Sequence, residues 1–176
     1  NALVKVDSYE HLMKISEEHG LSEHMVVQTA FGDSGHTTFF ISNKDDFDKH
    51  AEDIIKDPEV KVMKRINCRG ATLEAVATRS GTLVGPLLTE VVGAAELTPY
   101  KGGWCGNEVF AGAFSEEVRL KAREMAMKFG DQLLEEGYRG YFDLDFLIDK
   151  ETNEVYLGEL NPRICGASPM TNHTAF

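Results

Sequence analysis

The residues best suited to chemistry in this chain are Asp143, Asp145, Glu159 and Asn161. They lie on two runs rich in β-branched, aromatic and aliphatic residues, and the turn-like stretch 149–153 separates these runs. We therefore predict an antiparallel hairpin formed by 141–148 and 154–161. Side chains alternate faces along a strand, so the two residues of each pair share a face. A set of oxygen donors that includes one amide suits magnesium.

The register of this hairpin decides whether the four side chains can share a ligand. If the loop spans 150–154, Asp145 lies opposite Glu159 and Asp143 lies opposite Asn161. Like charges placed opposite each other repel, so such carboxylates must be exposed, protonated or neutralised by a cation. The alternative is a solvated hairpin whose acidic residues keep the surface soluble, and for any single carboxylate that explanation is the better one.

Arg163 follows the second run, after Pro162, whose fixed φ and missing amide hydrogen would end the strand ladder. A guanidinium beside a hard-metal site is a candidate phosphate clamp. Together with the four polar groups and with Gly166, the arginine favours a metal and phosphate site over a solvated hairpin.

Composition limits the function classes. The chain has 176 residues, 42% of them hydrophobic, so it can bury a core as one domain or as two small lobes. A net charge of -11 argues against nucleic-acid and anionic-membrane partners, which need clustered basic residues. No apolar run approaches the roughly 20 residues of a membrane span, and no signal-peptide pattern is visible, so we expect a cytoplasmic protein. Three widely spaced cysteines support neither a disulfide framework nor a zinc site.

The remaining pattern predicts mixed helices and strands. Ser8 and Gly20 bracket a helix as its two caps, and Ser115 and Gly137 bracket a longer one. A third helix is predicted over 43–56, and strands are predicted at 25–30, 37–41, 60–66, 72–78 and 82–92. The long connection 93–112 contains Trp104, which could be a loop anchor packed on the core or a substrate contact.

The segment 31–36 carries a Gly-x-x-Gly loop between two predicted strands. Such a loop can lay backbone amides along phosphate oxygens, because glycine allows close approach and positive φ. The same residues are also ordinary for a hairpin turn, and on this segment alone the two interpretations stay even. The loop is not a Walker motif, because no Gly-Lys-Ser/Thr follows it.

Taken in order, these segments resemble the ATP-grasp superfamily over essentially the whole chain. The most specific part is Asp145-Phe146 followed by Glu159-Leu160-Asn161-Pro162-Arg163, which is similar to the biotin carboxylase and carbamoyl-phosphate synthetase branch. The resemblance implies an α+β fold in which two lobes with mainly antiparallel sheets grip ATP. Residues 1–62 would form a small flap lobe with the glycine loop, and 63–176 a large lobe with the hinge strand, the metal hairpin and the phosphate arginine.

The resemblance also assigns roles to residues. Asp145, Glu159 and Asn161 match magnesium positions, with manganese as a substitute, and Glu159, Asn161 and Arg163 would act in catalysis. The residues expected to contact ATP are Gln28, Gly32, Asp33, Ser34, Gly35, His36, Met63, Lys64, Arg65, Ile66, Glu74 and Lys101.

Two positions depart from the family pattern. Gln28 stands where members commonly carry a lysine that contacts the α-phosphate, so a charge is missing there unless Lys64 or Lys101 supplies it. Biotin carboxylases continue after the arginine with Gln-Val-Glu-His, whereas this chain has 165–168, Cys-Gly-Ala-Ser, without the glutamate that acts on bicarbonate.

These departures favour a ligase that activates another carboxylate as an acyl-phosphate, for attack by an amine, thiol or similar nucleophile, with release of ADP and phosphate. The alternatives are bicarbonate activation as in biotin carboxylase and a nucleotide-binding module without turnover. The family pattern also predicts further parts of the same protein before and after this chain, and a homodimer is compatible with it. The carboxylate stays unidentified at this stage.

Overall fold

The computed structural model describes residues 1–30, 37–110 and 112–169. The chain divides into two compact units, Asn1–Ile66 with Thr98–Gly103 and Asn67–Leu97 with Trp104–Phe176. Each unit has its own sheet and its own hydrophobic core. All strand pairs in both sheets are antiparallel, which confirms the predicted α+β class with antiparallel sheets.

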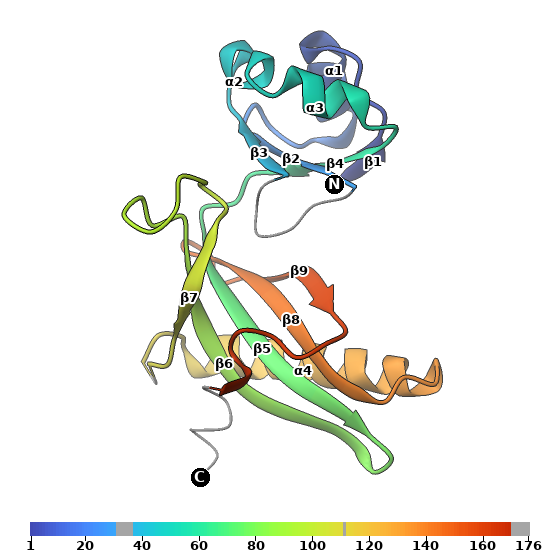
Figure 1. Cartoon of the computed structure of the whole chain (residues 1–176), viewed down its shortest axis with the longest axis vertical. Helices are drawn as coiled ribbons and strands as arrows, with labels where there is room; N and C mark the ends of the chain where they lie inside the picture. The colour runs from blue at the N-terminus through green and yellow to red at the C-terminus, as the bar shows by residue number, and fades with distance from the viewer. Residues whose placement is uncertain (31–36, 111, 170–176) are drawn as a thin grey trace. The chain divides into compact units, whose positions relative to one another are not determined.

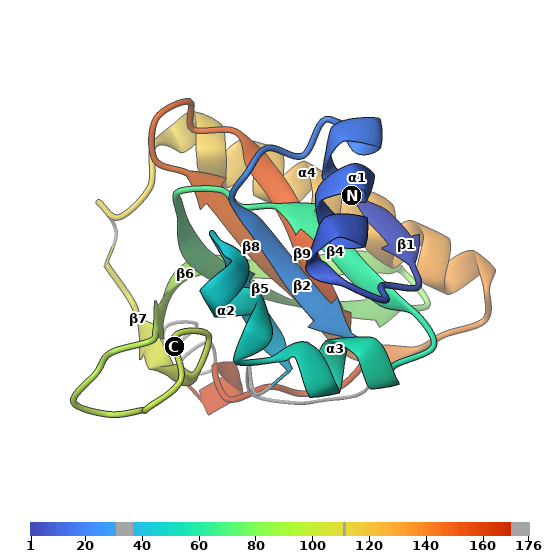
Figure 2. The same cartoon turned by 90° about the horizontal axis from the view of Figure 1, so that it is seen from above.

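The first unit is a four-stranded sheet with three helices over one face (Figures 1 and 2). Its strands, in spatial order, are β1 (Ala2–Val4), β4 (Val60–Lys64), β2 (Met25–Thr29) and β3 (Thr38–Ile41). The helices are α1 (Tyr9–His19), α2 (Lys44–Asp48) and α3 (Ala51–Lys56). Their apolar sides pack with Val27 and Val62 of the sheet in one core, because each element buries only one face.

The caps predicted for the first helix are confirmed. The Ser8 hydroxyl accepts a hydrogen bond from the His11 amide, and Gly20 has a φ of 61°. The prediction of a single helix over 43–56 is wrong, because the segment forms the two helices α2 and α3. The backbone leaves helical geometry at His50, whose φ is -123° and ψ is 9°, and the imidazole stacks on Phe39 with 4.6 Å between ring centroids.

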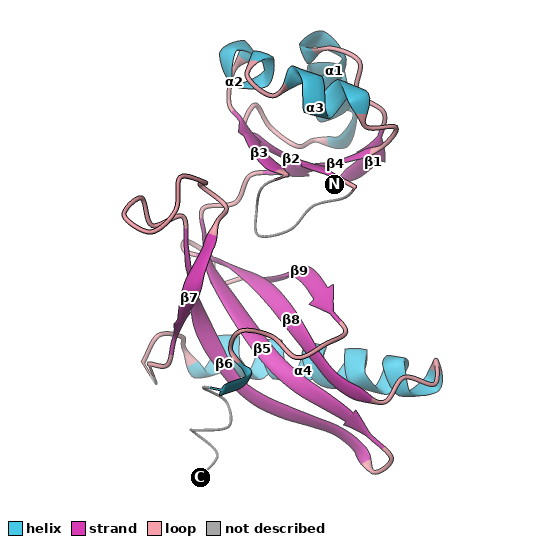
Figure 3. Ribbon diagram, viewed as in Figure 1, coloured by secondary structure: helices cyan, strands magenta, loops and turns pink. Residues whose placement is uncertain are grey.

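The second unit is a five-stranded sheet with one long helix along one face (Figure 3). Its strands, in spatial order, are β7 (Trp104–Glu108), β6 (Gly81–Val92), β5 (Cys68–Thr78), β8 (Gly140–Asp149) and β9 (Val155–Asn161). The helix is α4 (Glu116–Glu135), and the Ser115 hydroxyl caps it by accepting from the Val118 amide. Gly137, just beyond the helix, has the positive φ of 88° that its residue type predicted.

The helix covers the apolar face of this sheet. Buried residues of α4 pack with alternate residues of two central strands; these are Val118, Ala122 and Ala126 of α4, Ala71, Leu73 and Ala75 of β5, and Phe142, Leu144 and Phe146 of β8. Because side chains alternate along a strand, the residues between them point to the other face. That other face carries Thr72, Glu74, Asp143 and Asp145, so it is polar at the centre of the sheet.

Two strands are absent from the sequence prediction. β1 is only three residues long, and β7 lies inside the connection predicted as a loop. The run Trp104–Glu108 contains Gly106 and Asn107, residues that strands usually avoid, so its composition hides the strand. Among the described helices, none is both long and apolar enough to cross a bilayer.

Candidate metal and phosphate site

The predicted hairpin and its register are confirmed. Asp145 pairs with Glu159 and Asp143 pairs with Asn161 across β8 and β9. The turn is one residue tighter than predicted, because Ile148 pairs with Val155, and one extra residue in β9, Gly158, restores the predicted register before the site. A β-carbon at Gly158 would lie 3.1 Å from the Asp145 carbonyl oxygen, so glycine lets the bulge close more tightly than a residue with a side chain would.

Hydrogen bonds join the end of this hairpin to the arginine that follows. The Asn161 side-chain amide donates to Asp145 Oδ2 at 3.2 Å. The Arg163 guanidinium donates to Asn161 Oδ1 at 3.3 Å and to the Ile164 carbonyl at 3.2 Å. Arg163 is otherwise exposed, so its remaining donors can meet an anion.

A second layer of polar groups supports this end of the sheet. The Thr72 hydroxyl donates to Asp143 Oδ1, and both side chains are buried. The buried carboxylate of Glu74 accepts a hydrogen bond from the Ser168 hydroxyl, and the Cys165 thiol lies 3.9 Å from the same oxygen. The Cys165 amide in turn donates to Ser168 Oγ at 3.0 Å. Glu74 therefore ties the loop that follows Arg163 to the centre of the sheet.

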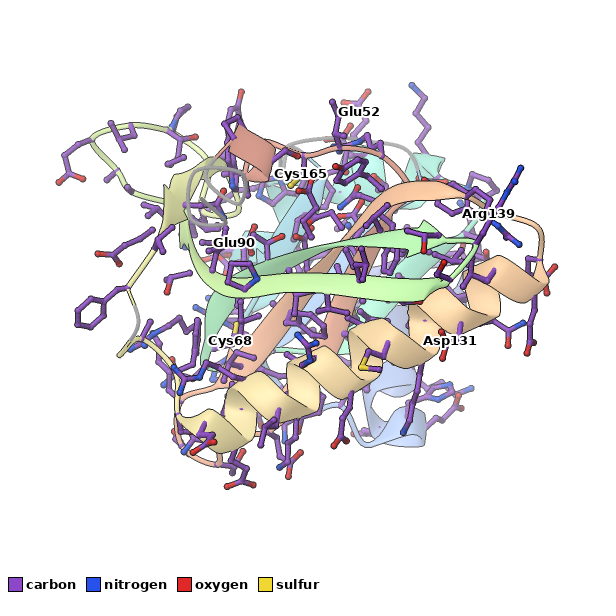
Figure 4. The ribbon with its side chains drawn as sticks, turned by 90° about the horizontal axis from the view of Figure 1, so that it is seen from below. Glu52, Cys68, Glu90, Asp131, Arg139 and Cys165 are labelled. Atoms are coloured by element: carbon purple, nitrogen blue, oxygen red, sulfur yellow. The ribbon has the colours of Figure 1, made fainter. Side chains whose placement is uncertain are left out.

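Glu90 of β6 also belongs to this face. Its partner position on β5 is Gly70, where a β-carbon would lie 2.9 Å from Glu90 Oε2, so the glycine makes room for the carboxyl group. In Figure 4, Glu90 and Cys165 both lie on the side of the sheet away from α4. The pairing of Thr72 with Leu88 gives Glu90 the same side as Thr72 and Asp145.

Burial and mutual repulsion disturb the acidity of these groups. Burial raises the pKa of Glu90 to about 8, and the charges of Asp145, Asp143 and Glu159 add to the rise. Burial raises the pKa of Asp145 to about 7, with the Asp143 charge as the next cause. The pKa of Asp143 is also raised by burial, and that of the Cys165 thiol is raised to about 11 by burial and by Asp143. The thiol is therefore protonated and a poor nucleophile at neutral pH.

The donor set fits a hard divalent cation. Carboxyl groups that hold protons near neutral pH, because burial and then their neighbours' charges raise their pKa values, gain from a cation that replaces those protons. Among residues 1–30, 37–110 and 112–169, no three His, Cys, Asp or Glu side chains are grouped so as to hold a metal by themselves. Magnesium is commonly held by one or two carboxylates together with substrate phosphates and water. Asp145, Glu159 and Asn161 supply two carboxylates and one amide oxygen, which matches a site of this kind.

The structure brings some predicted site residues together. Glu74 and Asp145 lie on the polar face at the centre of the second unit's sheet, and Glu159, Asn161 and Arg163 lie at and just beyond the end of β9 beside them. The predicted nucleotide contacts Gln28, Met63, Lys64, Arg65, Ile66 and Lys101 lie in the first unit. Gln28 is on β2, and the Arg65 guanidinium lies over the Phe40 ring at 5.4 Å. Gly32, Asp33, Ser34, Gly35 and His36 lie outside the described residues. Contacts of all these residues with ATP stay a prediction.

Sequence reasoning missed Thr72, Glu90 and Ser168. Thr72 could have been found, because it precedes Glu74 by two residues on a predicted strand and must share its face. Glu90 has a weaker signal, since its partial burial depends on Gly70 of another strand. Ser168 has none, because its partner Glu74 is distant in sequence.

No protein-family model and no curated protein matches the chain. Solved structures do match in fold. D-alanyl-alanine synthetase A from Vibrio cholerae has a TM-score of 0.75 at 13% identity, over 98% of this chain and 53% of its own. Biotin carboxylase from Campylobacter jejuni, in a complex with β-γ-ATP, has a TM-score of 0.73 at 19% identity. The match covers 94% of this chain and 36% of the biotin carboxylase chain.

N5-carboxyaminoimidazole synthase from Aspergillus clavatus, in a complex with ADP and 5-aminoimidazole ribonucleotide, has a TM-score of 0.71 at 17% identity, over 94% of this chain and 40% of its own. The chain thus spans about half or less of the length of these structures. At these identities the likeness concerns the fold. It covers nearly the whole chain and agrees with the two antiparallel sheets and with the hairpin that the sequence predicted. The chain therefore has the ATP-grasp fold.

Proposed function

We propose that this chain is the ATP- and magnesium-dependent module of a ligase that activates a carboxylate as an acyl-phosphate. The observation that carries the proposal is the hairpin register, which sets Asp145 against Glu159 and leaves Asn161 hydrogen-bonded to both Asp145 and Arg163. The similar folds of enzymes solved with ADP or β-γ-ATP support a nucleotide as the phosphate source.

In this reaction a carboxylate oxygen attacks the γ-phosphorus, the bond from that phosphorus to the β,γ-bridging oxygen breaks, and ADP leaves. The nucleophile then attacks the acyl carbon, and phosphate leaves. A bound magnesium ion would neutralise charge on the phosphates. Asp145, Glu159 and Asn161 would hold that ion, and the Arg163 guanidinium would orient the transferring phosphoryl group. The network of Glu74, Cys165 and Ser168 would hold the arginine's loop in place.

Bicarbonate activation is the less favoured alternative. In biotin carboxylases the glutamate that acts on bicarbonate follows the arginine, and the corresponding residue here is Ala167, which is 1% exposed. An alanine methyl group cannot act as a base. A nucleotide-binding module without turnover is the second alternative, and Gln28 in place of a lysine is the observation that favours it.

Trapping with hydroxylamine separates these three functions. Incubation of the full-length protein with MgATP, hydroxylamine and a panel of carboxylates should yield a hydroxamate together with ADP for the activated carboxylate. Nucleotide binding without ADP release for any carboxylate would support the module without turnover. ADP release that depends on bicarbonate alone would support the carboxylase alternative and contradict our proposal.

A further inference from the structure

The side-chain amide of Asn161 lies between two groups that need opposite partners. Its nitrogen donates to Asp145 Oδ2 at 3.2 Å, and its oxygen accepts from the Arg163 guanidinium at 3.3 Å. A guanidinium has donors and no acceptor, so only the amide oxygen can face Arg163, whether or not Asp145 carries a proton. The amide therefore has one orientation in this structure, with its nitrogen toward the carboxyl groups and its oxygen toward the arginine.

This orientation does not suit a metal ligand. Magnesium takes oxygen ligands, and an amide whose nitrogen is bonded to Asp145 directs its oxygen away from that carboxyl group. To serve a metal site beside Asp145 and Glu159, the Asn161 amide has to turn over. The same turn takes the oxygen away from Arg163 and presents an N–H group in its place, and two donors that face each other repel.

The backbone keeps Arg163 beside Asn161. The Arg163 amide donates to the Asn161 carbonyl at 2.8 Å, which closes a three-residue turn around Pro162, whose fixed φ suits such a turn. The guanidinium also donates to the Ile164 carbonyl at 3.2 Å. Both of these bonds of the guanidinium are long and lie on an exposed side chain, so they are easily exchanged for others. The arginine is thus folded back on its own segment by weak bonds.

The loop beyond the arginine is anchored. The Ser168 hydroxyl donates to the buried carboxylate of Glu74, and a β-carbon at Gly166 would lie 2.7 Å from Trp104 Cη2, so the indole packs on the glycine backbone. Because the backbone is held on both sides of the arginine, loss of the Asn161 oxygen would free the guanidinium without moving the loop. A free guanidinium can turn its fork of donors to a phosphate group.

Charge acts in the same direction as the lost hydrogen bond. Burial raises the pKa of Asp143, and the charge of Arg163 opposes that rise, so in its present position the guanidinium acts on the carboxyl groups of the sheet. A divalent cation beside Asp145 would repel a guanidinium held there. Both effects favour an outward position of the arginine once the carboxyl groups hold a metal ion.

We propose that Asn161 is a switch that restrains the Arg163 guanidinium until a metal ion at Asp145 and Glu159 takes the amide oxygen, and that the freed guanidinium then binds phosphate. This inference rests on the magnesium site of the proposed function and adds a coupling to it. A nucleotide that arrives without metal meets a restrained arginine. The residue type matters, because an aspartate offers two oxygens and could hold the metal and the arginine together.

Manganese binding in the absence of nucleotide measures the competition for the amide oxygen. The free ion is followed by electron paramagnetic resonance as Mn²⁺ is added to the full-length protein. Arg163→Met removes the competing donor, so we expect the affinity for Mn²⁺ to rise about tenfold. Loss of a positive charge contributes to this rise. In the Asn161→Ala background only that charge effect remains, and Arg163→Met should raise the affinity only about threefold.

Arg139→Met is the matched control, because Arg139 is exposed and its guanidinium also donates to nearby backbone carbonyls. It should leave the affinity for Mn²⁺ unchanged. An equal rise in the two backgrounds would overturn the switch and leave the metal site standing. Absence of Mn²⁺ binding, or binding that Glu159→Gln leaves unchanged, would overturn the switch as well. The ligase proposal fails only if magnesium-dependent binding of an ATP analogue is also absent, so the two failures can be told apart.

The release of the arginine can be measured directly by its reaction with phenylglyoxal. Arg79, exposed at the turn between β5 and β6, serves as the internal reference in the same mass spectra. Magnesium without nucleotide should speed modification of Arg163 about threefold relative to Arg79, because the guanidinium loses its acceptor. Asn161→Asp should abolish this acceleration. An equal acceleration in Asn161→Asp, or none in the original protein, would contradict the switch. If Asn161→Asp does not fold, the manganese measurements still decide.

Discussion

The crowded carboxyl groups of the second unit couple its stability to pH. Glu90 and Asp145 have pKa values raised to about 8 and about 7, against ordinary values of 4.5 and 3.8. At pH values between the ordinary and the raised pKa values, the folded chain binds more protons than the unfolded chain. The free energy of unfolding therefore falls as pH rises through this range. Below the ordinary pKa values, Glu90 and Asp145 are protonated in both the folded and the unfolded state. Above about pH 8 both groups are charged in both states, and the loss of stability is complete.

We therefore expect the metal-free chain to unfold at lower urea concentration at pH 8.5 than at pH 5.5. Denaturation in the presence of EDTA measures this difference. Glu90→Gln should reduce it, because the amide carries no charge to bury, while Glu124→Gln should leave it unchanged. Stability that rises between pH 5.5 and pH 8.5, or an unchanged pH dependence in Glu90→Gln, would contradict this account of the crowded face.

At the scale of single residues, the sequence indicated candidate ligands but not their surroundings. Asp145, Glu159 and Asn161 stand out because carboxylates at alternate positions of apolar strands are unusual and must share a face. Glu90 and Trp104 do not stand out. Their positions depend on Gly70 and Gly166, glycines whose missing side chains matter only through contacts from other strands and loops.

At the scale of elements, the β8–β9 hairpin depends on one bulge. Without Gly158 the tighter turn would shift the register by one residue and move Glu159 and Asn161 to the opposite face. Gly158→Ala places a methyl group 3.1 Å from the Asp145 carbonyl oxygen, so the bulge must open slightly.

We expect Gly158→Ala to lower stability by about 1 kcal/mol and to weaken magnesium-dependent nucleotide binding. Thr152→Ala is the matched control, because Thr152 supports the distant turn by accepting from the Glu154 amide. It should weaken the hairpin without changing nucleotide binding. If both variants bind the nucleotide as the original chain does, the bulge does not position the site.

The packing of α4 on β6 depends on a second glycine. Gly130 lies in the helix interior, where alanine is ordinarily favoured by about 1 kcal/mol. A β-carbon there would lie 2.3 Å from Thr82 Cγ2 and Oγ1, and 2.8 Å from Thr82 Cβ. Thr82 is β-branched and stiff, and its hydroxyl also donates to Asp131 at 3.1 Å, so it cannot easily move aside.

Gly130→Ala should therefore lower the free energy of unfolding by about 1 kcal/mol in spite of the better helix propensity. The double variant Thr82→Ala, Gly130→Ala should recover part of that loss, because the two closest atoms are gone. Thermal and urea denaturation of Gly130→Ala, Thr82→Ala and the double variant measure this coupling. A more stable Gly130→Ala variant would mean that the helix and strand are not in close contact there.

The elements that sequence reasoning found are those with local signals. Ser8, Gly20, Ser115 and Gly137 mark helix ends through hydrogen bonds and dihedral angles that these residue types favour by themselves. The break at His50 and the strand β7 have no such signal. They arise from the stacking of His50 on Phe39 and from the pairing of β7 with β6, which are tertiary contacts.

At the scale of the whole molecule, two units with separate cores carry different parts of the predicted ATP site. The sequence predicted the ATP-grasp fold because the motifs occur in the order of that superfamily, and the fold is confirmed. The lobe boundaries predicted from the same resemblance, 1–62 and 63–176, stay a prediction. The sequence could not predict the substrate side, since the sequences of 93–112 and 166–173 match no recognisable pattern. The contact of Trp104 with Gly166 joins those two segments.

The central claim is that Asp145, Glu159 and Asn161 hold magnesium for a bound nucleotide. Calorimetric titration with a non-hydrolysable ATP analogue, with and without magnesium, tests it most directly. We predict binding that requires magnesium and that Glu159→Gln weakens about tenfold or more, with circular dichroism unchanged and with Glu124→Gln as the control. Binding that is independent of magnesium, binding that is unchanged in Glu159→Gln, or no binding at all would contradict the claim.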